Sequence, residues 1–173
     1  MKITNSKLLV LAEFSILAVL VYTFENYLPK PLPFLKIGLA NIFILLILWQ
    51  LDLISAIIVS VSKVVIGSLL SGLIFTPVIL FSLVGSITSL IAMYTAHKIK
   101  INFSLIGVSI IGAIFHNISQ LIIAYFLFFK NIKIFYLVPL ILIMGLVSGL
   151  ITGSVAYFLN TKINLEKVLQ STT

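Results

Sequence analysis

Long apolar runs, separated by short segments that carry prolines, lysines or a lone acidic residue, occupy most of this 173-residue sequence. Such runs approach a length of about 20 residues, which a helix needs to cross the roughly 30 Å hydrocarbon core of a membrane. Only 9% of the residues are charged, against about 25% in soluble domains. A chain with so few charges cannot cover a water-facing surface, which excludes a soluble enzyme, a nucleic-acid-binding module and a disordered tail. The sequence therefore predicts an all-α integral membrane protein.

The apolar runs predict six transmembrane helices in a single bundle, with one domain over residues 1–173. The predicted spans are 8–24, 37–51, 53–75, 78–96, 104–129 and 134–159. Three prolines between residues 25 and 36 argue against regular helix in that segment. Asp52 is expected to mark a tight turn between the second and third spans.

The net charge of +7 comes from lysines that flank the apolar runs and do not form a basic patch. This placement is typical of the ends of membrane spans, so no nucleic-acid partner is expected. With the amino terminus inside, six of these lysines fall in cytoplasmic segments and four in external ones. The positive-inside rule then favours a multi-pass protein of the cell membrane with both termini in the cytoplasm.

Several chemistries are excluded by residue content. The sequence has no cysteine, and its two histidines are nineteen residues apart with no acidic residue nearby, so no metal site is expected. A single aspartate rules out the paired aspartate-rich motifs of a prenyl diphosphate synthase. There is no P-loop and no Ser/His/acid constellation. We expect no catalytic residues, no enzyme activity and no cofactor.

Lys63 stands near the middle of the third predicted span, roughly 15 Å deep at 1.5 Å per residue. A charge at that depth costs about 2.5–3.5 kcal/mol, so the side chain should face a partner or a wet cavity. One interpretation is a structural ion pair, for example with Glu13. The other is contact with a ligand or ion.

A second polar group lies in the fifth predicted span. His116 and Gln120 are four residues apart and share one helical face, with Asn117 beside them. Polar side chains between membrane helices often act only as glue, at about 0.6 kcal/mol each. That interpretation stays open for Asn117 and Gln120, whereas for His116 binding or proton handling is favoured.

The segment from Glu25 to Ile42 is a proline-stiffened outer loop that leads into a helix. Lys36, Gly38 and Asn41 fall in the first turns of that helix. A helix amino terminus offers unpaired N–H groups and a positive dipole end, which favour an anion, and Lys36 adds a full charge. The segment is either a lid at a binding site or a rigid connector.

Together these residues predict an outward-facing cavity for an anionic small molecule. The predicted substrate-binding residues are Lys36, Asn41, Lys63, His116, Asn117 and Gln120. Gly145, Gly149 and Gly153 recur every four residues in the last span, and we interpret them as a surface for close helix packing.

Three motifs carry a resemblance to a known family. They are Lys36-Ile37-Gly38-Leu39-Ala40-Asn41-Ile42, Lys63 through Gly72, and Gly112 through Leu121. Over nearly the whole chain, and in this order, they resemble the membrane family labelled heptaprenyl diphosphate synthase component I, also called Gx transporter. Two positions depart from the expected family pattern: Lys63 replaces an arginine, and Leu35 replaces a glycine that often precedes the Lys36 motif.

This family is similar in size and helix count to the substrate-binding S-components of energy-coupling factor (ECF) transporters. Those proteins have six helices, bind vitamins or related small molecules from outside, and use a coupling membrane subunit and ATPases. The resemblance implies an S-component-like fold and the role of substrate-binding component in small-molecule uptake. It also implies as partners a small-molecule ligand, membrane lipid and an ECF coupling subunit with its ATPases.

Two other functions remain open. One is a proton-coupled secondary transporter that acts alone, with His116 and Glu13 carrying protons. The other is a non-catalytic membrane accessory to polyprenyl or quinone synthesis that holds a lipid intermediate.

Overall fold

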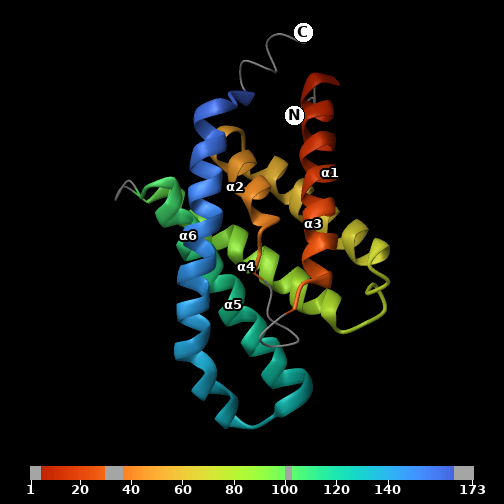
Figure 1. The fold of residues 1–173 in the computed structure, drawn as a ribbon, viewed down its shortest axis with the longest axis vertical. Helices are drawn as coiled ribbons and strands as arrows, with labels where there is room; N and C mark the ends of the chain where they lie inside the picture. Colours follow the sequence, from red (N-terminus) through yellow and green to blue (C-terminus); the bar gives the residue numbers. More distant parts are fainter. Residues whose placement is uncertain (1–4, 30–36, 100–102, 166–173) are drawn as a thin grey trace.

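The structure of the protein is a computed structural model that describes residues 5–29, 37–99 and 103–165. The described part consists of helices and the turns that connect them, with no strand. Its elements are α1 (Asn5–Tyr27), α2 (Asn41–Gln50), α3 (Leu53–Leu70), α4 (Val78–Lys98), α5 (Leu105–Ala124), the π-helical η1 (Tyr125–Phe129), the 3₁₀-helical η2 (Ile132–Leu137) and α6 (Val138–Lys162). In Figure 1, α1 and α6 run in opposite directions, so that the first turn of α1 and the last turn of α6 lie at the same end of the molecule.

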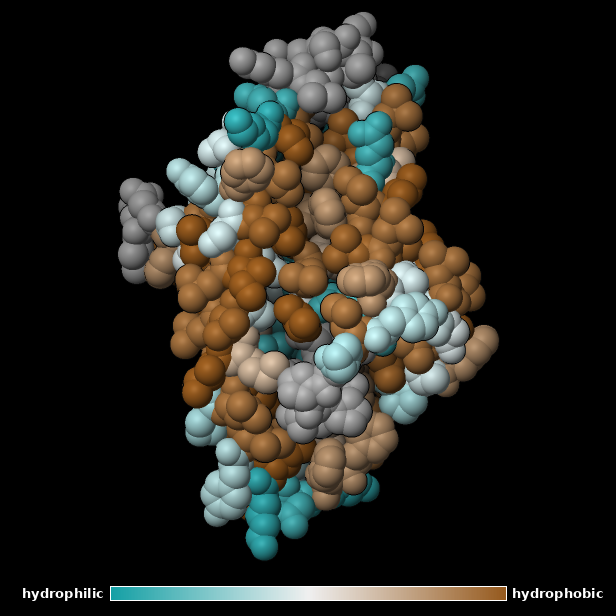
Figure 2. Space-filling model, viewed as in Figure 1, coloured by the Kyte–Doolittle hydropathy of each residue, from teal (hydrophilic) through white to brown (hydrophobic). Residues whose placement is uncertain are grey.

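Five helices in the described residues are long and apolar enough to cross a membrane. They are α1, α3, α4, α5 continued by η1, and α6 preceded by η2. Figure 2 shows a mostly hydrophobic middle zone between ends where hydrophilic side chains gather. The protein is therefore a multi-pass helical membrane protein, as the sequence predicts.

The second predicted span, residues 37–51, differs from the structure. Its helical part is α2, whose 10 residues extend about 15 Å, half the hydrocarbon thickness. Residues 37–40 form a turn in place of the first helical turns, because Gly38 has a φ of +83°, which the right-handed helix does not allow. Of the six spans expected from the sequence, the described residues thus show five helices long enough to cross a membrane, and the second span, already short in the sequence, becomes a half-length helix.

Other boundaries differ by a few residues. The first helix continues to Tyr27, beyond the predicted end at residue 24. The third ends at Leu70 and not at residue 75, because Gly72 takes a φ of +68°. The amide N–H of Leu73 then donates to the Ser68 carbonyl at 2.8 Å, as in a Schellman motif.

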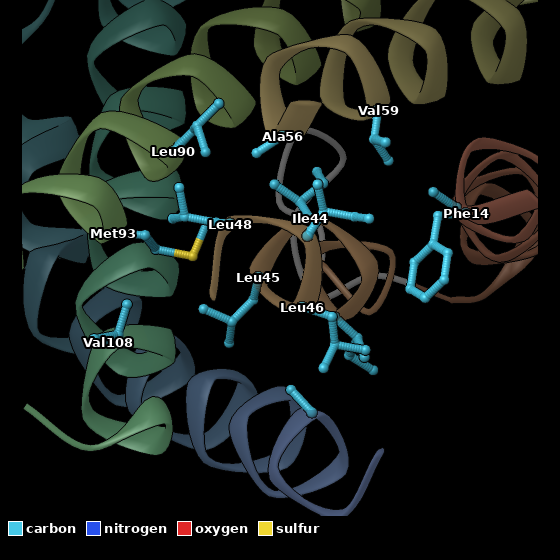
Figure 3. Close-up of a cluster of buried hydrophobic side chains, with 14 of the residues drawn as sticks. Phe14, Ile44, Leu45, Leu46, Leu48, Ala56, Val59, Leu90, Met93 and Val108 are labelled. Carbon is cyan, nitrogen blue, oxygen red and sulfur yellow. The ribbon is translucent and has the colours of Figure 1, made fainter. Parts of the chain in front are cut away.

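The short helix α2 lies at the centre of the bundle. In Figure 3 its side chains point to all sides, toward Phe14 of α1, Val59 of α3 and Met93 of α4. Buried residues of α2 are Ile42, Ile44, Leu45, Leu46, Ile47 and Leu48. A helix that is apolar all round is stable only where neighbouring helices or lipid surround it. Here helices surround it, so the start of α2 lies inside the protein at membrane depth.

Helix α6 packs along α5 through the predicted glycine surface. A Cβ added to Gly149 would lie 2.5 Å from the Ile110 Cα, and one added to Gly153 would lie 2.9 Å from the Ile106 Cα. The two backbones therefore approach more closely than side chains would permit, which confirms the packing role predicted for these glycines.

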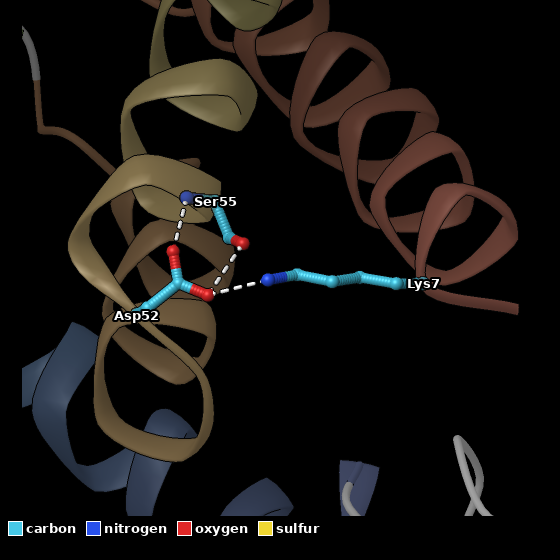
Figure 4. Close-up of polar contacts among 3 residues, drawn as sticks. All are labelled: Lys7, Asp52 and Ser55. Atoms are coloured by element: carbon cyan, nitrogen blue, oxygen red, sulfur yellow. Dashed lines mark hydrogen bonds and ion pairs between the residues drawn. The ribbon is translucent and has the colours of Figure 1, made fainter. Parts of the chain in front are cut away.

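The turn between α2 and α3 is fixed by Asp52, as Figure 4 shows. Its carboxylate accepts hydrogen bonds from the Ser55 backbone N–H at 2.9 Å, capping α3, and from Lys7 Nζ at 2.6 Å. Burial raises the pKa of the Asp52 carboxyl, but the hydrogen bonds from Lys7 and Ser55 outweigh it and hold the pKa below the ordinary value of 3.8. The tight turn expected at Asp52 is confirmed.

Candidate ligand-binding site

The α3 helix carries Lys63 into the bundle at the depth where α2 begins. Its side chain is only 2% exposed, and Nζ donates a 2.7 Å hydrogen bond to Oδ1 of Asn41. Glu13, the partner considered from the sequence, is exposed on α1. Lys63 therefore bonds to the side-chain amide of Asn41 on α2. Asn41 and Lys63 each lie ten residues from the α2–α3 turn, one along α2 and the other along α3.

A second helix, α1, also forms a hydrogen bond to this region, at the turn that precedes α2. The backbone N–H of Gly38 donates to the Oε1 atom of Glu25, which lies in the last turn of α1 and is 2% exposed. Within the turn, the Gly38 carbonyl accepts the Asn41 backbone N–H at 2.9 Å. Glu25 on α1 and Lys63 on α3 thus bond two groups of one short segment, the turn that begins α2.

Helix α5 contributes three predicted residues, all buried. His116 Nε2 and Gln120 Nε2 lie 3.1 Å apart, which joins these two side chains along one helical face. The imidazole rests on the bare backbone of Gly85 in α4, since a Cβ there would approach the ring Cε1 to 2.8 Å. Asn117 is 2% exposed and faces the same interior region.

Two small cavities lie around these side chains. The first cavity is lined by groups that include Glu25, Lys63, Ser86 and Tyr22, and the second by groups that include Asn117, Ser89 and Ser109. Gly38, Asn41 and His116 line both cavities, so they separate one from the other. Each cavity has a volume of about 10 Å³, close to the space that one water molecule needs.

Two serine hydroxyls on α4 face these cavities without a hydrogen-bond partner among the described residues. Ser86 Oγ adjoins the first cavity and Ser89 Oγ the second, and both side chains are buried. The Gln120 Oε1 atom is also buried and unpartnered. Because nearly all buried polar groups in proteins are hydrogen-bonded, unpartnered groups beside a cavity indicate a place for a polar ligand or water.

The structure brings together Asn41, Lys63, His116 and Asn117, and His116 connects Gln120 to them. Lys36, Pro31 and Pro33, predicted as part of a binding edge and lid, lie outside the described residues, whereas Pro29 is described and exposed. The described residues contain no group of three or more His, Cys, Asp or Glu side chains that would hold a metal ion.

Sequence reasoning did not identify Glu25 or Tyr22 as site residues. A signal was present, because Ala18, Tyr22 and Glu25 recur at spacings of four and three along α1, and all three are buried. That periodicity places Glu25 on the inward face of the helix, next to Gly38. Because the sequence prediction starts a non-helical loop at residue 25, it does not assign Glu25 to the inward face of the first helix.

A larger hollow lies at the opposite end of the helices. It has a volume of about 460 Å³ and is lined by residues that include Trp49, Asp52, Tyr94 and Lys98. None of the predicted binding residues that the structure describes adjoins it. We therefore place the candidate site at the two small cavities, where polar groups from α1, α3, α4, α5, α6 and the start of α2 converge.

Comparison with known proteins gives one relationship. The sequence model of the family described as "Heptaprenyl diphosphate synthase component I" matches residues 14–159, a range that includes the whole candidate site. No curated protein and no solved structure matches the chain. With most of its 173 residues inside the match, the chain belongs to the heptaprenyl diphosphate synthase component I family.

Proposed function

We propose that this protein is the substrate-binding membrane component of an uptake transporter for a polar small molecule. One observation carries the proposal: charged and polar side chains from six helices converge on two cavities inside a mostly apolar bundle. Burying these groups is costly in a membrane protein, and such groups commonly mark a substrate or ion pathway.

The half-length helix supports a binding role. Irregular backbone is tolerated at membrane depth only where protein or a water-filled cavity surrounds it. Residues 37–40 are such a segment, and they lie against both cavities. In transporters, interrupted helices of this kind often form the substrate site.

The side from which the ligand enters follows from the proposed orientation. If both termini are cytoplasmic, the end of α1 that carries Glu25 lies toward the exterior. The cavities then lie closer to the outside, as uptake requires. Because the sequence has no P-loop, energy for transport would come from partner proteins. If the protein acts like an ECF S-component, these partners are a coupling subunit and its ATPases.

Retention of small molecules by the purified protein tests this function. The full chain in detergent would be equilibrated with a mixture of vitamins, amino acids and carboxylic acids, washed, and analysed by mass spectrometry. At least one compound should be retained by the wild type and lost by Lys63→Met, while the amount of folded protein stays nearly unchanged. Retention that is equal in both proteins, or absent from the wild type, contradicts a substrate-binding role.

A proton-coupled transporter acting alone is the second candidate. It is favoured by three titratable side chains, Glu25, Lys63 and His116, that line one cavity. Liposomes that contain only this protein would show sustained uptake of a retained compound under an imposed pH gradient. A binding component that depends on partners would show binding without sustained uptake.

A membrane accessory to polyprenyl synthesis is the third candidate, and the family description favours it. The expected result is copurification with a soluble prenyl synthase, together with a retained isoprenoid lipid and no water-soluble ligand.

A further inference from the structure

The two charged side chains of the first cavity are occupied by the protein's own groups. Glu25 accepts the Gly38 backbone N–H, and Lys63 donates to the Asn41 carboxamide oxygen. An incoming ligand that contacts Glu25 and Lys63 has to displace these two groups. Because buried charged groups left unpaired cost several kcal/mol, it also has to replace the bonds that they make.

The net charge of the cavity restricts the ligand further. Among the described lining residues, Glu25 and Lys63 sum to zero if both are ionised, and also if the proton passes from the lysine to the carboxylate, while the His116 imidazole and the Tyr22 phenol add no charge in their neutral forms. A ligand with a net charge would therefore leave an uncompensated charge in the interior of the bundle. In that environment, where water is largely excluded, an unpaired charge is strongly disfavoured.

We infer that the ligand of this site is a small molecule without net charge that offers a hydrogen-bond donor to Glu25 and an acceptor to Lys63, in place of Gly38 and Asn41. Zwitterionic amino acids and neutral amides have this chemistry. The inference rests on the proposed binding function and specifies its ligand class. It replaces the anionic ligand expected from Lys36 and Lys63, because that expectation did not include Glu25.

The two cavities support this mode of entry. Each holds only about 10 Å³, too little for a ligand larger than water, and Gly38 and Asn41 lie between them. When the turn that contains both residues moves aside, the two cavities join. A ligand there would reach the unpartnered hydroxyls of Ser86 and Ser89, one from each cavity.

Charge variants test the ligand class. The full chain in detergent would be equilibrated with an equimolar mixture of neutral amides, zwitterionic amino acids, monocarboxylates and monoamines, and the retained compounds would be identified by mass spectrometry. The wild type should retain net-neutral compounds. Glu25→Gln should change the preference toward monocarboxylates by about tenfold or more, and Lys63→Met toward monoamines by a similar factor. Glu13→Gln, on the exposed face of the same helix as Glu25, is the matched control and should keep the wild-type preference.

The outcomes separate this inference from the proposed function. If the wild type retains monocarboxylates and Glu25→Gln leaves that preference unchanged, the ligand class is wrong and the binding function stands. If the wild type retains nothing above a protein-free control, the binding function itself fails, and the ligand class with it.

A second measurement tests the displaced turn without a ligand. The chain has no cysteine, so Ala40→Cys places a single thiol in this turn, at a position that is 1% exposed. Adding Glu25→Gln should raise the rate of maleimide labelling about tenfold, because the carboxylate no longer holds Gly38. Adding Glu13→Gln should leave the rate unchanged. Equal rates in all three proteins would show that Glu25 does not hold the turn and would overturn the inference.

Discussion

Lys63, in the middle of α3, donates a 2.7 Å hydrogen bond to the side chain of Asn41, the first residue of α2. The bond joins a helix long enough to cross the membrane to the start of a helix half that length. Its donor is an ammonium group, and hydrogen bonds to charged groups contribute about 1.5–3 kcal/mol. The position of α2 in the bundle therefore depends in part on one buried polar pair.

A double-mutant cycle checks this coupling. Asn41→Leu and Lys63→Met should each lower the free energy of unfolding in detergent by about 1–3 kcal/mol, because each leaves a buried polar partner without its bond. The double variant should lose less than the sum of the single losses, since the bond is broken only once. Strict additivity would mean that the two side chains do not interact.

Acid should remove the stabilisation that Asp52 provides. Its pKa in the folded protein lies below the ordinary value, so the carboxylate stabilises the fold fully above about pH 4. That contribution is lost as the pH falls through the folded-state pKa. The thermal unfolding midpoint of the wild type should decline as the pH falls through this range, and the midpoint of Asp52→Asn should decline less.

Lys7→Met provides the control for this pH effect. It removes the 2.6 Å partner of the carboxylate, so the folded-state pKa of Asp52 should rise toward its unfolded value, and the acid decline should be smaller than in the wild type and end at a higher pH. A decline in Asp52→Asn identical to that of the wild type would assign the acid sensitivity to other groups.

Glycine-to-alanine variants along α6 should follow the available space. The added Cβ would meet α5 backbone at 2.5 Å for Gly149, 2.9 Å for Gly153 and 3.1 Å for Gly145. Losses of stability should decrease in that order, with about 1–3 kcal/mol for the most crowded position.

Gly107→Ala is the matched control for this series. The nearest atom to its added Cβ is 3.5 Å away, an ordinary contact. Alanine there should leave stability unchanged or raise it by up to about 1 kcal/mol, because alanine has the higher helix propensity. A loss at Gly107 as large as that at Gly149 would contradict steric packing as the cause.

Gln50 at the end of α2 should hold the segment after α6 in place. Its amide donates to Asn160 Oδ1 at 2.8 Å and to the Ile163 carbonyl at 2.9 Å, and its Oε1 accepts the Leu165 N–H at 2.8 Å. Gln50→Leu removes all three bonds, at about 1 kcal/mol each, and should speed hydrogen exchange at the Leu165 amide. Asn160→Ala removes only the first bond and should have a much smaller effect. Equal exchange rates in Gln50→Leu and the wild type would contradict this role.

Parts of the candidate site could be predicted because membrane burial makes polar residues conspicuous. Lys63 and His116 stand out in apolar runs, and both line the first cavity. Their partners could not be predicted in the same way. The sequence predicts Asn41 as a binding residue near the start of a helix, but not as the partner of Lys63. Glu25 lies at the edge of an apolar run, where a polar residue is expected to meet water, and only the tertiary packing shows that it bonds to Gly38 in the interior.

The sequence by itself determined that the chain is a helical membrane protein, because hydrocarbon requires long apolar segments whose backbone bonds are satisfied internally. It also predicted a close-packing surface on the last helix, because three glycines share one face, whereas the structure shows that α5 is the helix packed against it. Only the tertiary structure decided that α2 is a buried half-length helix. An apolar run reads the same whether lipid or protein surrounds it, so the difference lies in the turn at Gly38 and in the bonds from Glu25 and Lys63 that hold it.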